Sequence, residues 1–395
     1  MDRIKDKVLC NPTVKLVKGC EYPFVGIDKI TSGNRDITPT AKETYTGQSC
    51  SKFRKGDTIM ARITPCLENG KIARYNLDSE LAMGSTELFV FREMEKISDN
   101  NYIYYLISTN YVRNNAVNSM TGASGRQRAD IKFIGKLKWN FPEYDIQCRI
   151  GKILSTYDDL IEKNNRKIQI LQDMAEELYK EWFVRFRFPG YKTAKFIDGI
   201  PDGWEIRRLR EYGNIETGKT PSTEKSEYYG TDIPFVKTPD MHNNMWTFET
   251  EEMLSEKGNN SQPKKLLPGN SIMVSCIGTG GIVSINAVPA HTNQQINSII
   301  LDDLNNLEWL FYTCVSLKET IISFGSTGAT MTNLSKGKFE NLKTLYPGNI
   351  LVKEYHNRTN TIFTSIKNLM YQNKCLRQQR DLLLPRLMSG KLEVC

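Results

Sequence analysis

Hydrophobic positions in residues 150–186 recur at alternating gaps of three and four, the spacing that places them along one stripe of an α-helix. The other positions are mostly charged, and no proline or glycine interrupts the segment after Gly151. At 1.5 Å per residue, a helix of this length would extend roughly 55 Å. Because similar amounts of sequence flank the segment, we predict a spacer between two modules. The stripe comprises Ile150, Ile153, Leu154, Tyr157, Leu160, Ile161, Ile168, Leu171, Met174, Leu178 and Trp182.

Short runs of β-forming residues, separated by Gly, Asn and Ser turns, precede and follow this helix. The first half contains TIMARI (58–63), ELFVF (87–91) and a helical pattern at 101–117. After a linker with proline and glycine, the second half contains IPFV, SIMVSCI, INSIILDD and a helical pattern at 307–324. The pattern predicts an α/β (α+β) protein with a first module at 1–143, a central spacer helix at 144–188, a linker and second module at 189–347, and a distal spacer helix at 348–395.

The second module repeats the first at an offset of about 205 to 213 residues. YPFV (22–25) matches IPFV (233–236), and KGDTIM (55–60) matches PGNSIM (268–273). Further along, residues 121–142 match 326–347, and NRKIQILQDM (165–174) matches NKCLRQQRDL (373–382). Each match is weak alone, but their common order predicts an internal duplication. The period is far too long for a solenoid.

Residues 350–389 carry a second apolar stripe, so the duplication extends to the helix. Neither stripe can be buried by its own module, because each continues beyond it, and we predict that the two helices pack on each other as an antiparallel coiled coil. Asn164, Asn165 and Asn373 interrupt the stripes, either as tolerated polar positions or as residues that set the register. Two related modules on such a rod, with an approximate twofold axis, suit a target with two separated half-sites, and DNA is the commonest such target.

The composition is that of a soluble globular protein, with 39% apolar and 25% charged residues among 395. A net charge of +8 fits a protein that binds a polyanion but does not prove one. The sequence lacks a run of about 18 apolar residues and an apolar segment near the N-terminus, so we expect neither a transmembrane helix nor a secretory signal. Nine scattered cysteines without a CxxC pair, and three histidines far apart, indicate a reducing cytoplasm and argue against a metal site.

The order of module, helix, module and helix resembles the DNA-specificity subunit of type I restriction–modification systems over the whole chain. The segments that carry the resemblance are NRKIQILQDMAEELYKEWFVRF after the first module, PDGWEIRRLREYGNIETGKTPS at the start of the second, GDTIM and GNSIM, and RQQRDLLLPRLMSGKL at the C-terminus. The first module departs from the family pattern, because it has NPTVKLVKGC in place of a GW-x-x-x-x-L opening and a GKTP loop.

This resemblance implies a non-catalytic subunit with two target recognition domains, each reading one half of a bipartite site in double-stranded DNA. It also implies that the helices space these domains and dock two methyltransferase subunits, which bind S-adenosylmethionine and methylate adenine N6. A restriction (motor nuclease) subunit that uses ATP and Mg²⁺ would bind to the complex through the methyltransferase subunits. The chain itself would hold no cofactor, would be cytoplasmic and would contact no membrane. A rod of roughly 55 Å exceeds one DNA turn of about 34–36 Å, which fits unread base pairs between half-sites.

GNIETGKT (213–220) fits the phosphate-loop pattern G-x-x-x-x-G-K-[ST], but its surroundings do not fit. WEIRRLREY before it is not a buried strand, and PSTEKSEYYG after it is not an amphipathic helix, so we expect a loop without ATP. GTGG (278–281) lacks the spacing of a cofactor loop, and the sequence has no [DNS]-P-P-[YF] motif of amino-methyltransferases. The adjacent carboxylates Asp158/Asp159 and Glu176/Glu177 point in different directions on a helix, which favours a solvated or partner-binding face over acid–base pairs.

Basic and polar loop residues are the candidates for DNA contacts. In SMTGASGRQRAD (119–130), Arg126 and Arg128 could fork onto guanine O6 and N7, and Gln127 could pair with adenine; contact with phosphate or solvent alone is the alternative. The counterpart segment GSTGATMTNLSKGK (325–338) offers hydroxyl, amide and lysine groups for the same purpose, and phosphate contact is expected for basic residues on predicted strands. The predicted DNA-contacting residues are Arg62, Lys71, Arg74, Arg126, Gln127, Arg128, Lys219, Thr220, Lys237, Thr330, Thr332, Asn333 and Lys336.

Two other functions fit parts of the sequence. One is a stand-alone DNA methyltransferase or nuclease, an interpretation that S-adenosylmethionine binding by the purified chain alone would favour. A coiled-coil scaffold protein would bind DNA weakly and without sequence preference, which salt-dependent competition assays would reveal. The duplicated plan of module and helix favours the DNA-reading subunit over both.

Overall fold

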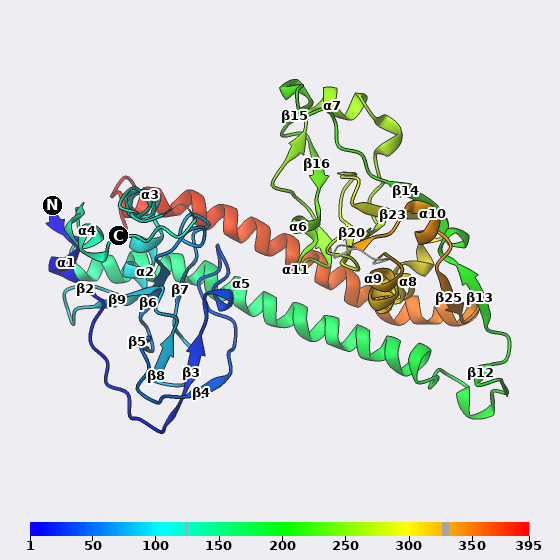
Figure 1. Cartoon of the computed structure of the whole chain (residues 1–395), viewed down its shortest axis with the longest axis horizontal. Helices are drawn as coiled ribbons and strands as arrows, with labels where there is room; N and C mark the ends of the chain where they lie inside the picture. Colours follow the sequence, from blue (N-terminus) through cyan, green and yellow to red (C-terminus); the bar gives the residue numbers. More distant parts are fainter. Residues whose placement is uncertain (124, 326–331, 395) are drawn as a thin grey trace. The chain divides into compact units, whose positions relative to one another are not determined.

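The computed structural model of the chain describes residues 1–123, 125–325 and 332–394 (Figure 1). These residues form two compact units. Unit 1 comprises residues 1–164 together with 373–395, and unit 2 comprises residues 165–372. Each unit therefore combines one module with segments of both long helices.

The predicted central helix is present as α5 (Tyr144–Tyr179), which continues into a π-helical turn (Lys180–Val184). The helix begins earlier than the apolar stripe, because residues 144–149 are also helical. It stops before Phe186, whose φ of +56° lies in the left-handed region that an α-helix of L-residues avoids. The distal helix is α11 (Asn349–Met388).

Within each unit, segments of α5 and α11 contact each other. In unit 1, Asn164 Nδ2 donates to Asn373 Oδ1 at 3.0 Å, and Asp158 pairs with Arg380, so the two segments run in opposite directions there. In unit 2, the Tyr355 hydroxyl donates to the Ala175 carbonyl at 2.9 Å. Two of the three predicted polar interruptions thus meet in a buried hydrogen bond, while a coiled coil along the full helices stays a prediction.

Unit 1 contains two four-stranded sheets. The run ELFVF lies in β9 (Leu88–Glu93), and β6 (Thr58–Ala61) from TIMARI pairs with it antiparallel. The helix α2 (Asn100–Ser108) lies against both strands in Figure 1. The sheet orders are β2 (Val8–Cys10), β9, β6, β7 (Ile72–Arg74), and β4 (Lys42–Thr44), β3 (Glu21–Val25), β8 (Leu81–Gly84), β5 (Ser51–Arg54).

The predicted helix at 101–117 is two helices, α2 (Asn100–Ser108) and α3 (Asn110–Asn118). Thr109 has an extended backbone and its side chain accepts a hydrogen bond from the Val112 N–H, so it caps α3 and ends α2. The remaining elements of unit 1 are α1 (Ile4–Lys7), α4 (Ile131–Lys136), and the paired strands β1 (Asp2–Arg3) and β10 (Lys138–Trp139).

Unit 2 has a corresponding five-stranded sheet in the order β14 (Gly213–Thr217), β23 (Ile296–Leu301), β19 (Ile272–Ser275), β21 (Val283–Asn286), β17 (Trp246–Thr247). A four-stranded sheet has the order β15 (Tyr229–Gly230), β18 (Met253–Leu254), β16 (Ile233–Val236), β22 (His291–Thr292). The predicted helix at 307–324 is again divided, into α8 (Leu307–Ser316) and α9 (Lys318–Gly325). Smaller elements are α6 (Thr238–Met241), α7 (Glu256–Asn260), α10 (Lys336–Phe339), and the strand pairs β11 (Phe196–Ile197) with β12 (Ile200–Pro201), β13 (Glu205–Arg208) with β25 (Lys343–Tyr346), and β20 (Ile277–Gly278) with β24 (Thr332–Asn333).

The strand orders confirm the duplication predicted from sequence. The order β2, β9, β6, β7 in unit 1 corresponds to β14, β23, β19, β21 in unit 2. The parallel pair β3 and β8 likewise corresponds to β16 and β22, which places Met83 at the position of His291. In each unit the equivalent helix, α2 or α8, supplies many of the buried core side chains.

Candidate nucleic-acid interface

Three charged side chains meet at the end of β6 and the start of β9 in unit 1. Arg128 donates from Nε to both carboxylate oxygens of Glu87, at 3.0 and 2.9 Å, and from Nη2 to Oε1 at 2.7 Å. Arg62 Nε lies 3.6 Å from Glu87 Oε2, and its guanidinium lies over the Phe89 ring at 5.3 Å from the centroid. The structure therefore brings together the predicted residues Arg62 and Arg128 around a carboxylate that the sequence did not single out.

Backbone hydrogen bonds fix this cluster. The Arg62 N–H donates to the Glu87 carbonyl at 2.9 Å, and the Ala129 N–H donates to the Arg62 carbonyl at 2.8 Å. The hydrogen bonds from Arg128 lower the pKa of Glu87, and Arg62 adds to the effect. Glu87 is consequently a carboxylate at neutral pH, and the cluster of two guanidinium groups and one carboxylate keeps a net positive charge.

Of the other predicted residues of unit 1, Arg126 is exposed, whereas Gln127 and Lys71 are half-buried and hydrogen-bonded within the protein. Arg126 is exposed on the same loop, and the Gln127 N–H donates to Thr64 Oγ1 at 3.2 Å. Lys71 Nζ donates to the Ile27 carbonyl at 3.0 Å.

Arg74 lies apart from the Arg128 loop. It pairs with Thr58 at the far end of β6, and its guanidinium donates to Asn101. Burial lowers the pKa of Arg74, and the nearby Arg35 adds to the shift. Arg74 is thus half-buried and already hydrogen-bonded within the protein.

The GNIETGKT segment does not form a phosphate loop. Residues 213–217 form β14, which pairs antiparallel with β23, and the irregular residues after it lead into a short 3-10 turn at Ser226–Tyr228. A phosphate loop instead connects a buried strand to the N-terminus of a helix.

Gly218 sets the path of the next residues. A Cβ atom at this position would lie 2.2 Å from the Asn293 carbonyl oxygen and 2.2 Å from Thr292 Oγ1. The close approach lets the Lys219 N–H donate to the Thr292 carbonyl at 2.9 Å. The Thr220 hydroxyl then donates to Gln294 Oε1 at 2.6 Å.

The predicted residues of unit 2 gather on adjoining loops. Gln295 Oε1 accepts from Asn293 Nδ2 at 3.1 Å and from the Thr238 hydroxyl at 3.3 Å, next to the predicted Lys237. Thr332 and Asn333 form β24, which pairs with β20 directly after Cys276. Lys219, Thr220 and Lys237 therefore lie next to residues 292–295, and β24 is linked to the same segment through Cys276, whose N–H donates to the Gln295 carbonyl.

Not every predicted residue of unit 2 is equally available. Lys237 forms an ion pair with Glu252, and Thr332 is buried. Lys336 is exposed in the first turn of α10. Thr330 lies outside the described residues. Sequence reasoning missed Gln294 and Gln295, and the strand pairing in the structure aligns Gln295 with Glu87, which it also missed.

We predict that Gly218→Ala destabilises unit 2 by about 1–3 kcal/mol, because the added methyl group would overlap backbone and side-chain atoms of Thr292 and Asn293. Hydrogen–deuterium exchange of the β14 and β22 amides in the full chain would measure the loss of protection. Gly337→Ala is a matched control, since a Cβ there would meet no atom within 4 Å. Equal protection in the two variants would contradict the prediction.

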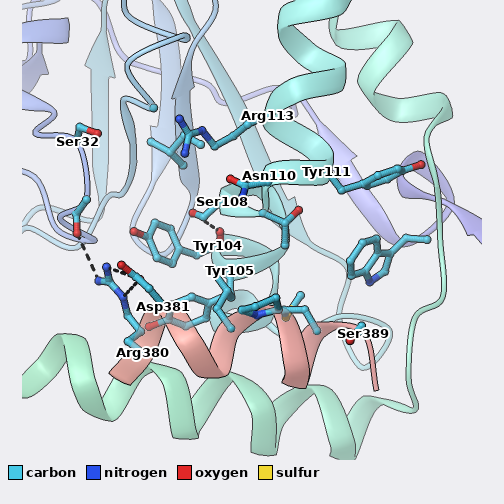
Figure 2. A pocket seen from close by; sticks show the side chains of 18 residues that line it. Ser32, Tyr104, Tyr105, Ser108, Asn110, Tyr111, Arg113, Arg380, Asp381 and Ser389 are labelled. Carbon is cyan, nitrogen blue, oxygen red and sulfur yellow. Dashed lines mark hydrogen bonds and ion pairs between the residues drawn. The ribbon is translucent and has the colours of Figure 1, made fainter. Parts of the chain in front are cut away.

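A cavity of about 490 Å³ lies within unit 1, lined by α2, α3 and the C-terminal part of α11 (Figure 2). None of the described residues predicted to contact DNA lines it. Figure 2 shows Arg380 and Asp381 on α11 near Tyr105, with Asn110 and Arg113 on another side of the cavity. Arg380 donates to the Gly33 carbonyl at 3.3 Å and forms ion pairs with Asp158 and Asp381. Its charge is therefore compensated within the protein.

Both halves of the duplicated fold are similar to known proteins. The family profile described as type I restriction modification DNA specificity domain matches residues 10–172 and again residues 201–348. The chain therefore belongs to this family, whose domains supply DNA specificity in type I restriction–modification systems. The two matches fall on the two halves that the internal repeat defines.

Similar relatives span most of the chain. The HindI specificity subunit of Haemophilus influenzae is 29% identical over 408 residues, covering 88% of each chain. The MjaIX specificity subunit of Methanocaldococcus jannaschii is 26% identical over 302 residues, covering 74% of this chain and 69% of the relative. The crystal structure of a type I restriction–modification S subunit from M. genitalium shares the fold, with a TM-score of 0.59 and 13% identity over 98% of this chain and 95% of the other.

No helix among residues 1–123, 125–325 and 332–394 has the length and apolar character needed to cross a bilayer. The same described residues contain no group of three or more His, Cys, Asp or Glu side chains arranged to hold a metal ion.

Proposed function

We propose that this chain is the non-catalytic specificity subunit of a type I restriction–modification complex, and that each unit reads one half of a bipartite site in double-stranded DNA. The observation that carries the proposal is the repeated loop framework. Hydrogen bonds link Arg62, Glu87 and Ala129 in unit 1, and equivalent bonds link Cys276, Gln295 and Leu334 in unit 2. In unit 2 the Cys276 N–H donates to the Gln295 carbonyl at 2.7 Å, and the Leu334 N–H donates to the Cys276 carbonyl at 2.9 Å.

The two frameworks present different chemistry. At equivalent positions, unit 1 carries Glu87 and Arg128, whereas unit 2 carries Gln295 and Asn333. Hydrogen-bonding side chains select bases through their donors and acceptors, so the same backbone with different side chains would read different sequences. This difference supports two half-sites of unlike sequence.

The proposal extends to the domain boundaries and partners. Target recognition domains at 1–143 and 189–347 would be joined to spacer helices at 144–188 and 348–395. The helices would dock two methyltransferase subunits that methylate adenine N6 and, through them, restriction subunits. S-adenosylmethionine, ATP and Mg²⁺ would bind to these partners in the cytoplasm, while the DNA contacts would come from the candidate residues of this chain.

A genetic experiment tests this function. Genome-wide mapping of N6-methyladenine, in cells that hold the methyltransferase subunits with and without this chain, is expected to reveal one split motif only when the chain is present. The motif should contain two short specific halves separated by unspecified base pairs. Absence of any chain-dependent motif would refute the proposal. S-adenosylmethionine binding by the purified chain alone would instead favour a methyltransferase, and sequence-indifferent DNA binding would favour a scaffold.

A further inference from the structure

Glu87 engages Arg128 from one side. The carboxylate lies against the edge formed by Nε and Nη2, at distances of 2.7 to 3.0 Å. Nη1 makes no hydrogen bond with any residue in the described part of the chain, and the Arg128 side chain is 44% exposed. A guanidinium has five N–H donors in a rigid fork, so this arrangement leaves the outer edge, formed by Nη1 and Nη2, free to meet a ligand.

The outer edge has the geometry to bind guanine. Two parallel N–H groups of arginine match the O6 and N7 acceptors that guanine alone presents in the major groove. A phosphate could also accept from this edge, but a contact to phosphate carries no sequence information. The two ligands therefore differ in a measurable property, namely the sequence dependence of binding.

Glu87 and its neighbours hold the fork before DNA arrives. The Glu87 backbone is bonded to Arg62, the loop backbone is bonded at Ala129, and Arg62 supplies a second ion pair to the same carboxylate. An arginine fixed in this way loses less side-chain entropy on binding than a free one. Because two guanidinium groups face one carboxylate, the cluster keeps the positive charge that attracts DNA.

We propose that Arg128 reads a guanine in the half-site of unit 1 and that Glu87 is the residue that positions it. This inference rests on the proposed function, since it requires unit 1 to contact DNA. At the equivalent place unit 2 has the carboxamides Gln295 and Asn333 in place of the ion pair. We therefore expect Arg128 and Glu87 to impose a guanine in the half-site that unit 1 reads, and not in the half-site that unit 2 reads.

A second Arg–Glu pair in unit 1 provides a matched control. Arg54 Nη2 lies 2.8 Å from Glu93 Oε1, with 42% exposure of the arginine side chain. Glu93 is the last residue of β9, whereas Glu87 directly precedes the strand. At about 3.3 Å per residue, the two carboxylates lie at opposite ends of a strand roughly 20 Å long.

The test maps adenine methylation by the full complex of this chain with its methyltransferase subunits. Arg128→Ala is expected to reduce the preference for guanine at one position of one half-site by roughly 10- to 100-fold, while the other half-site stays unchanged. Arg128→Lys keeps the charge but loses the fork, so the same single position should relax. Glu87→Ala should relax it by a smaller factor, and Arg54→Ala should leave the motif intact.

The outcomes separate this inference from the function on which it rests. A split motif that is identical for wild type, Arg128→Ala and Arg128→Lys would overturn the role of Arg128 and leave the specificity-subunit proposal standing. An even loss of methylation over all sequences, with a weaker dependence on salt, would show a phosphate contact and also overturn it. No chain-dependent motif in wild type would overturn both. Retention of the second half-site specificity in each variant would show that the complex still assembles.

Discussion

Arg380→Met is expected to destabilise unit 1 by about 3–5 kcal/mol, because it removes one partner of a buried ion pair and leaves the other charge uncompensated. The pair joins Arg380 on α11 to Asp158 on α5, and their side chains are only 9% and 4% exposed. Amide exchange of residues 102–107 in α2, measured on the full chain, would report the opening free energy of this unit.

The magnitude follows from how Asp158 is surrounded. Its carboxylate also accepts a hydrogen bond from the buried Tyr105 hydroxyl. Burial raises the pKa of Asp158, and the positive charge of Arg380 opposes that shift. Without Arg380, the buried carboxyl group would either remain charged with less compensation or take up a proton, and both alternatives cost free energy of folding.

Two variants test this explanation. The double variant Asp158→Asn/Arg380→Met removes both charges and keeps an acceptor for Tyr105, so it should cost less than about 2 kcal/mol relative to wild type. Arg54→Met breaks an exposed pair of the same unit and should cost less than about 1 kcal/mol. If Arg380→Met proved as mild as Arg54→Met, or if the double variant were no better than the single one, the buried pair would not carry this stability.

The same pair shows why part of the structure could not be predicted from sequence. The sequence predicts a solvated or partner-binding helix face at Asp158 and Asp159, but Asp158 is buried, while Asp159 pairs with Arg35. The partners come from positions 222 and 124 residues away, so no local pattern indicates them. By contrast, the long helix and the duplication were predictable, because helical spacing and repeated order are properties of the sequence itself.

The candidate interface was also predictable only in part: the sequence indicated which loops correspond, but not all of the residues that meet there. The offset between residues 121–142 and 326–347 predicted which loops correspond, and hydrogen bonds at Ala129 and Leu334 confirm it. Glu87 was missed because one carboxylate before a strand carries no distinguishing pattern, and its role depends on Arg128 beside it. The division of the helices at Thr109 and Leu317 was missed because apolar spacing continues through both positions.

His291 in β22 of unit 2 is fully buried and bonded as a neutral imidazole. Its Nε2 lies 2.9 Å from Asn259 Oδ1, and its Nδ1 lies 3.4 Å from Gln262 Nε2. Because the amide nitrogen of Gln262 is a donor, Nδ1 has to accept, which leaves the proton on Nε2. Gln262 Nε2 also donates to the Lys219 carbonyl at 2.9 Å, so the same amide holds the candidate contact loop.

Acid is therefore expected to weaken unit 2 through His291. Burial lowers the pKa of His291 from 6.5 to about 4, so the unfolded chain binds a proton more tightly than the folded one. The stabilisation is complete above pH 6.5 and is lost as the pH falls towards 4. At about 1.4 kcal/mol per pKa unit, the loss between pH 7 and pH 5 is about 2 kcal/mol. Amide exchange of β22 and β16 in the full chain at several pH values would measure it.

The residue that unit 1 places at this position supplies the matched variant. Met83 is the equivalent of His291 in the parallel strand pair, so His291→Met removes the titrating group with a side chain the fold accepts elsewhere. The variant loses hydrogen bonds to Asn259 and Gln262 and should be less stable at pH 7, but its stability should vary less between pH 7 and 5. A pH dependence equal to that of wild type would show that other groups, and not His291, cause the acid sensitivity. A reduced dependence would show that protonation of His291 causes the acid sensitivity of unit 2.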